Sequence, residues 1–192
     1  MTEAERAALE TEIRRRYDAD DLEGAMHVAI DGYGPELYGF ITGLSSNTIH
    51  ADDAFGATCE KLWKGLPKFR WQSTFRVWAY TIARNEFMRI ATAPARREIP
   101  VSNIASVQQA IDRVRTTTPM HKRSEVKDEF AAIRAELSPE DHMLLGLRID
   151  RKLAWNEIAE ILGDGSPAAL RKRFERLKDR LRELISRWDN ET

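Results

Sequence analysis

The chain has 192 residues, of which 42% are hydrophobic and 32% charged, and its 30 basic and 31 acidic side chains leave a net charge near −1. This length allows one medium domain or two small ones. No apolar run approaches the roughly 18 residues of a membrane span, and the acidic start lacks the pattern of a secretory signal, so we expect a cytoplasmic protein with no membrane insertion. The single cysteine, Cys59, excludes an intramolecular disulfide and a cysteine-rich zinc site. The four histidines lie far apart and lack the spacing of metal ligands, so we expect neither a metal nor a cofactor.

The near-zero net charge conceals a strong asymmetry along the chain. Residues 1–53 sum to −8, residues 54–97 to +7 and residues 166–188 to +5. Two separated basic stretches, the first of them rich in aromatic residues, are typical of a nucleic-acid footprint. The alternative is a pair of solvated helix faces, and charge alone does not separate the two interpretations.

The first part of the chain predicts helices, and no run of alternating β-branched residues interrupts them, so the fold class is all-α. A helix is expected over Glu3–Tyr17, and Asp20 or Asp21 caps the next one. Gly34-Pro35 then ends that helix and starts another, which runs to about Leu44 and closes an αα-hairpin.

Two more helices follow. Asp52 or Asp53 is expected to cap the first, which Gly65 and Pro67 stop. Thr74 caps the second, on which Phe75, Trp78, Ala79 and Ile82 share a buried face while Arg76, Tyr80 and Arg84 point elsewhere.

Residues 98–124 have the composition of an interdomain linker. Ile104, Val107, Ile111 and Val114 are spaced three, four and three, which predicts a short amphipathic helix inside the linker, ordered against a partner.

The C-terminal part has the pattern of a helix-turn-helix. Ser138-Pro139 starts a helix, a second helix holds Trp155, and a turn with Gly163 and Gly165 leads to a long helix opened by Ser166-Pro167. The basic residues of this last helix, which we expect on its exposed surface, are Arg171, Lys172, Arg173, Arg176 and Lys178. The alternative is a basic helical hairpin or coiled coil that binds no nucleic acid.

These segments carry a family resemblance. The stretches Ala51-Asp52-Asp53-Ala54-Phe55, Leu66 to Arg70, Ser73 to Tyr80 and Ile82 to Asn85 resemble the promoter-melting region of bacterial extracytoplasmic-function (ECF) sigma factors. Downstream, Leu137 to Glu140, Glu157 to Gly163 and Leu170 to Phe174 resemble the same family's C-terminal helix-turn-helix, in the same order.

The resemblance implies a two-domain, non-enzymatic initiation factor: a sigma region 2-like domain at 1–97, a flexible linker at 98–124 and a region 4-like domain at 125–192. Its implied partners are core RNA polymerase, through the β′ and β subunits, and promoter DNA, with an anti-sigma factor as a further candidate. No acid/base, nucleophile or metal constellation and no phosphate-binding glycine loop indicates an enzyme.

The resemblance also implies site residues. Promoter opening takes bases out of the stack, and a loop with cations, aromatic planes and hydrogen-bonding groups suits an extruded base. The residues expected at the −10 element are Lys68, Phe69, Arg70, Trp71, Gln72, Ser73, Thr74, Arg76, Arg84 and Asn85. For Phe69 and Trp71, a role in the core and a role as base contacts are both open. Those expected at the −35 element are Ser166, Arg171, Lys172, Arg173 and Arg176, arginine being the usual reader of guanine.

The polymerase contact departs from the family pattern. Asp52, Asp53 and Phe55 match it, but Gly56 and Ala57 stand where the family has a Gln-acid pair. Two hypotheses follow: that a regulatory kinase restores the negative charge by phosphorylating Thr58, or that the chain is a sigma-like decoy that occupies an anti-sigma factor or polymerase without initiating transcription. The turn before the last helix, residues 164–169, is also one residue longer than the commonest form.

Overall fold

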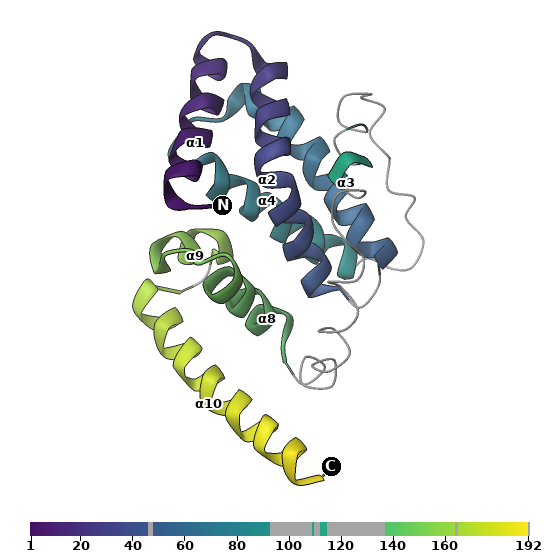
Figure 1. Cartoon of the computed structure of the whole chain (residues 1–192), viewed down its shortest axis with the longest axis vertical. Helices are drawn as coiled ribbons and strands as arrows, with labels where there is room; N and C mark the ends of the chain where they lie inside the picture. The colour runs from purple at the N-terminus through teal and green to yellow at the C-terminus, as the bar shows by residue number, and fades with distance from the viewer. Residues whose placement is uncertain (46–47, 93–108, 110–111, 115–136, 164, 192) are drawn as a thin grey trace. The chain divides into compact units, whose positions relative to one another are not determined.

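The computed structural model describes residues 1–45, 48–92, 109, 112–114, 137–163 and 165–191 (Figure 1). Every regular element in this part of the chain is helical, which confirms the all-α prediction. The chain divides into two compact units, residues 1–118 and 119–192. The limits expected for the two domains and the linker remain predictions. No described helix is long and apolar enough to span a bilayer.

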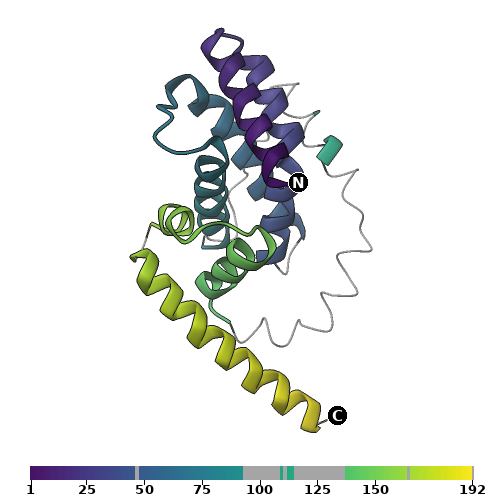
Figure 2. The same cartoon turned by 60° about the vertical axis from the view of Figure 1, so that its left-hand side comes forward.

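Four helices form most of the first unit: α1 (Glu3–Asp18), α2 (Leu22–Leu44), α3 (Thr48–Gly65) and α4 (Phe75–Ala91), with a 3₁₀ turn η1 (Leu66–Lys68) before α4. Helix α1 packs on α2, while α2, α3 and α4 pack on one another. Figures 1 and 2 show α1 and α2 side by side, joined at one end by a short turn. Aromatic side chains fill the core, and Tyr33, Phe55, Phe75 and Tyr80 are fully buried.

Side-chain caps start α2 and α4 as predicted, and of the two candidates for α2 the structure selects Asp21. The Asp21 side chain accepts a hydrogen bond from the Gly24 amide at 2.9 Å. Thr74 accepts one from the Val77 amide at 3.2 Å. Each of these bonds joins residues three apart, so the sequence can locate a cap to within a residue or two.

The αα-hairpin expected at Gly34-Pro35 is wrong, because α2 runs through Pro35 as one helix. An internal proline costs a helix roughly 3 kcal/mol through a lost hydrogen bond and a steric clash. Both halves of α2 bury apolar side chains against the same core, among them Met26 and Ile30 before the proline and Leu37 and Ile41 after it. This burial on both sides offsets the cost and keeps the helix continuous.

The start predicted for the third helix is also wrong. Helix α3 begins at Thr48, so Asp52 and Asp53 lie in its second turn and neither caps it. The predicted stop holds, since α3 ends at Gly65 and the 3₁₀ turn containing Pro67 follows.

The buried face of α4 differs from the one expected. Phe75 and Ala79 are buried, but Trp78 and Ile82 are only half-buried. Buried instead are Arg76, Val77, Tyr80, Ala83, Glu86, Phe87 and Ile90. Helix α4 packs on both α2 and α3, so the buried arc is wider than one amphipathic stripe and includes charged residues.

The second unit contains α8 (Pro139–Leu145), a π-helical turn η2 (Gly146–Asp150), α9 (Trp155–Leu162) and α10 (Pro167–Glu191). Ser138 and Ser166 cap α8 and α10, accepting hydrogen bonds from the amides of Asp141 and Ala169, both at 3.2 Å. Helix α9 ends at Gly163, whose φ of +64° favours glycine. Helix α10 packs on α8 and α9, burying Leu170, Phe174, Leu177 and Leu184.

Most of the predicted linker helix lies outside the described residues, including Ile104, Val107 and Ile111. Val114 is described, and it is 4% exposed.

Candidate nucleic-acid interface

The loop between α3 and α4 is anchored by Phe69. Its side chain is only 9% exposed, and its ring stacks on Trp78 with centroids 4.4 Å apart and planes 16° apart. Trp78 in turn covers Gly65, where an added Cβ would lie 2.9 Å from the tryptophan ring. Phe69 is therefore a core residue, which decides between the two roles left open from sequence.

Trp71 is the aromatic residue that the loop presents near its surface. Its φ of +54° is rare for a residue with a side chain, and it is half-buried. Tyr17 meets its ring edge-on at 5.4 Å, and the Arg14 guanidinium lies 4.7 Å from its ring centroid. Phe69 also meets the ring at a tilt, with centroids 4.8 Å apart, so these contacts hold the half-buried Trp71 side chain in a fixed position within the loop.

Helix α1 supports this loop, which the sequence did not reveal. The Tyr17 hydroxyl donates a hydrogen bond to the Phe69 carbonyl oxygen at 3.1 Å, across 52 residues of chain. The Arg14 guanidinium that covers Trp71 is itself held by Asp18 at 2.8 Å. No local spacing links these residues to the loop, so only the packing of α1 identifies them.

Some polar side chains of the loop are exposed to solvent, and others make hydrogen bonds within the fold. Lys68, Arg70 and Gln72 are exposed, and Ser73 is half-buried. Thr74 is exposed and caps α4 with its hydroxyl. Beyond the cap, Asn85 is exposed and accepts a hydrogen bond from the half-buried Arg84 at 3.1 Å. Two cations and a tryptophan plane thus share one short loop.

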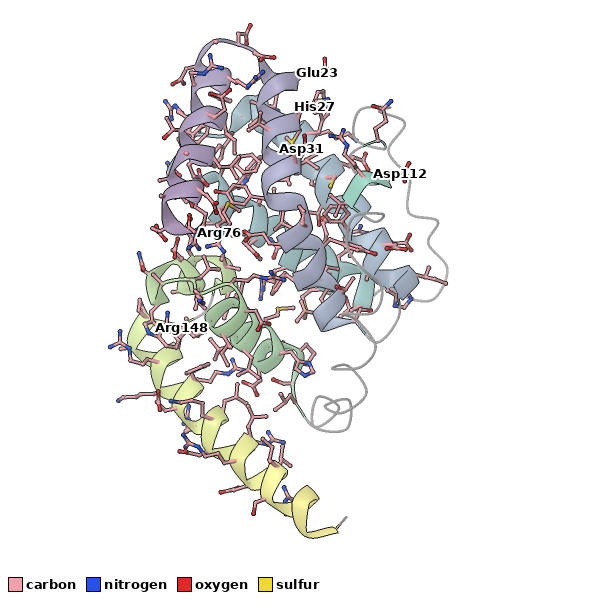
Figure 3. The ribbon with its side chains drawn as sticks, in the orientation of Figure 1. Glu23, His27, Asp31, Arg76, Asp112 and Arg148 are labelled. Atoms are coloured by element: carbon pink, nitrogen blue, oxygen red, sulfur yellow. The ribbon has the colours of Figure 1, made fainter. Side chains whose placement is uncertain are left out.

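Arg76, labelled in Figure 3, was expected to contact the −10 element, and the structure corrects this assignment. It is 6% exposed, and its Nε lies 2.7 Å from Oε1 of Glu36 on α2. Burial disfavours its charge, but the hydrogen bond and the negative charge of Glu36 prevail and raise the pKa of the Arg76 guanidinium. Because its charge is neutralised inside the unit, Arg76 is not placed to bind DNA.

Glu10 holds the start of α4 from α1. Its carboxylate accepts hydrogen bonds from the backbone amides of Phe75 and Arg76, both at 2.9 Å. It also accepts one from the Tyr33 hydroxyl at 2.7 Å, and burial together with this carboxylate raises the pKa of the Tyr33 phenol. Negative charge at a helix N-terminus is favourable, so Glu10 orients the helix that follows the loop.

The residues expected to bind polymerase are only partly accessible. Asp52 and Asp53 are half-buried, and Asp52 accepts a hydrogen bond from the Tyr38 hydroxyl at 2.6 Å. Phe55 is fully buried and stacks at a tilt on Tyr38, with centroids 5.1 Å apart. Phe55 is therefore a core residue, and the expected polymerase contact at this position is corrected.

The structure also corrects the hypothesis that a kinase phosphorylates Thr58. Its side chain is fully buried, and its hydroxyl donates to the Ala54 carbonyl oxygen at 2.7 Å. A kinase cannot reach a hydroxyl in this position without unfolding α3, so the phosphorylation hypothesis loses its structural basis.

The basic residues at the start of α10 separate into two groups. Arg171, Lys172 and Arg176 are exposed, as is Ser166. Arg173 instead lies 2.7 Å from Asp141 of α8 and approaches the Ser138 hydroxyl at 3.5 Å. Arg173 therefore ties α10 to α8, which corrects its assignment as a purely DNA-facing residue.

Trp155, at the start of α9, connects the basic helix to the preceding turn. The Arg171 guanidinium lies 5.8 Å from its ring centroid and the Arg148 guanidinium 4.8 Å (Figure 3). Phe174 meets the same ring edge-on at 5.4 Å. The tryptophan ring thus contacts one arginine of η2 and one of α10, and Arg148 is not among the residues expected at the −35 element.

One family model matches part of the chain. Residues 29–96, about a third of the chain, match the model of the family described as Sigma-70 region 2. The matched range contains α3, the loop and α4, and most of α2. No curated protein matches the chain.

Proposed function

We propose that the chain is an alternative sigma factor of the extracytoplasmic-function type, which binds core RNA polymerase and directs it to specific promoters. The observation that carries this proposal is the match of residues 29–96 to sigma-70 region 2, because that range includes the whole Trp71 loop and the helix it precedes. Sigma-70 region 2 implies binding to core polymerase and promoter DNA, and a non-enzymatic, cytoplasmic role.

At the −10 element, the loop residues with solvent access are the proposed contacts: Lys68, Arg70, Trp71, Gln72, Ser73 and Thr74, with Arg84 and Asn85 on α4. Lys68 and Arg70 bind phosphates, and Trp71 stacks on an extruded base. The loop needs no large rearrangement for this, because Tyr17 and Phe69 already hold its backbone.

At the −35 element, α10 is the proposed recognition helix of a helix-turn-helix made with α9. Its exposed cations near the N-terminus, Arg171, Lys172 and Arg176, are the proposed groove and phosphate contacts, and the amides capped by Ser166 lie at the same end. We propose residues 1–97 and 125–192 as the two DNA-binding domains.

The polymerase contact is proposed at the carboxylates of Asp52 and Asp53 on α3, with the β′ subunit as the partner and the β subunit contacted elsewhere. Tyr38 orients Asp52 by its hydrogen bond, while Asp53 has solvent access. An anti-sigma factor is a further proposed partner.

The test is run-off transcription with purified core polymerase on a library of promoters, read by sequencing the 5′ ends of the products. A sigma factor yields transcripts with a shared −10 and −35 pattern upstream. Absence of transcripts on every promoter, with polymerase binding retained, would favour the second candidate, a sigma-like decoy. The observation that favours the decoy is the presence of Gly56 and Ala57 where the family has a Gln-acid pair.

A further inference from the structure

A short piece of the linker lies on α2. Arg113 Nη1 is 2.9 Å from Asp31 Oδ1, across 82 residues of chain. The next residue, Val114, is 4% exposed. Figure 3 shows Asp31 on α2 below Glu23 and His27, and Asp112 on the separate short segment.

The absence of a side chain at Gly34 leaves the space on α2 into which Val114 packs, and we call this space the seat. A Cβ added at Gly34 would lie 2.8 Å from Val114 Cγ2, closer than real Cβ contacts, so the missing side chain is what lets the linker approach. The same added atom would meet Ile30 at 3.4 Å and Phe55 at 3.7 Å, and these side chains line the seat. Asp31 and Gly34 are three residues apart and so share one face of the helix.

The apolar contact contributes more than the ion pair. Arg113 and Asp31 are 50% and 51% exposed, and exposed pairs of this kind contribute little. Val114, by contrast, is nearly removed from water, which is the favourable part of such a contact. The ion pair chiefly selects the register in which Val114 meets Gly34.

We propose that the Asp31–Gly34 face of α2 is a docking site for the chain's own linker segment, Asp112–Val114. The inference does not depend on the proposed function, because it concerns the free protein. Docking ties the chain to the first unit again at Asp112–Val114, well after α4 ends at Ala91.

The experiment is limited trypsin digestion of the full-length protein, following cleavage after Arg113 by mass spectrometry. Cleavage after Lys122 in the same molecules is the internal reference, and the same bonds in urea-unfolded chains correct for sequence preference. In Val114→Ser, cleavage after Arg113 is expected to accelerate about tenfold relative to the reference. In Asp31→Asn it is expected to accelerate less than threefold, since the pair is exposed.

Asp18→Asn is the matched control, because it removes another exposed Arg–Asp pair of the same unit, with Arg14, and leaves the docking face intact. Its cleavage after Arg113 is expected to equal that of the unmodified protein. Cleavage of Val114→Ser at the unmodified rate, or an equal acceleration after Lys122, would overturn the proposal. Absence of transcription in the run-off assay, with protection of the Arg113 bond intact, would reject the proposed function alone.

Discussion

Glu36 and Arg76, 40 residues apart in the chain, form an ion pair inside the helical bundle, with Glu36 Oε1 2.7 Å from Arg76 Nε. Their side chains are only 15% and 7% exposed. The pair joins α2 to α4, and Arg76 also lies beside the ring of Tyr80, 5.6 Å from its centroid. A basic residue in the middle of a basic stretch thus serves the fold and leaves DNA contacts to its neighbours.

Breaking this pair from one side should destabilise the unit. Glu36→Gln leaves a buried guanidinium without its counter-charge, and we expect a loss of about 3 kcal/mol in the free energy of unfolding, measured by urea denaturation. The double variant Glu36→Leu, Arg76→Met should recover most of it. If the double variant folds but no longer binds a single-stranded −10 oligonucleotide, Arg76 contacts DNA after all.

Glu10 should contribute far more to the stability of the first unit than an exposed glutamate does. Glu10→Gln keeps the size of the side chain but removes the negative charge that faces two amides of α4, and we expect a loss of about 1.5–3 kcal/mol in stability by the same measurement. Glu3→Gln is the control, since the Glu3 side chain is 91% exposed. Equal effects of the two substitutions would contradict the role assigned to Glu10.

A substitution at Trp71 should weaken DNA binding without lowering the stability of the fold. Trp71→Gly removes the ring but also relieves the left-handed backbone, which costs a residue with a side chain roughly 1–2 kcal/mol. We expect stability to change little, while affinity for the −10 oligonucleotide falls about tenfold or more through lost stacking, measured by fluorescence anisotropy. Affinity at the level of the unmodified protein would exclude Trp71 from the base-binding surface.

Arg171 and Arg173 should behave differently although they are two residues apart. Arg171→Ala is expected to weaken −35 binding and to reduce the slope of log affinity against log salt by about one, with no loss of stability. Arg173→Ala breaks the contact with Asp141 and is expected to lower stability by about 1 kcal/mol while leaving the salt slope nearly unchanged. The reverse assignment of slopes would mean that Arg173 leaves Asp141 to bind a phosphate.

Thr58 should tolerate an apolar substitution and reject a charged one. Thr58→Val keeps the shape and loses one hydrogen bond to a helix carbonyl, so we expect a change below about 1 kcal/mol. Thr58→Glu forces an unpaired carboxylate into the core and is expected to prevent folding, as followed by circular dichroism. A folded Thr58→Glu protein with raised polymerase affinity would restore the phosphorylation hypothesis.

The sequence alone determined the all-α class and the caps Thr74, Ser138 and Ser166, and it narrowed the cap of α2 to Asp20 or Asp21, because each cap acts through a hydrogen bond to an amide three residues away. It also located the loop around Trp71, since the cations and aromatic residues there are adjacent in the chain. Such features depend on neighbours that the sequence lists side by side.

Only the tertiary structure decided what each side chain faces. The continuity of α2 through Pro35 depends on burial along both halves of the helix, and the burial of Arg76 depends on a carboxylate 40 residues away. The roles of Glu10 and Tyr17 rest on contacts across 65 and 52 residues. Spacing within one helix carries no information about a partner on another helix, so these residues became part of the candidate site only when the bundle brought them together.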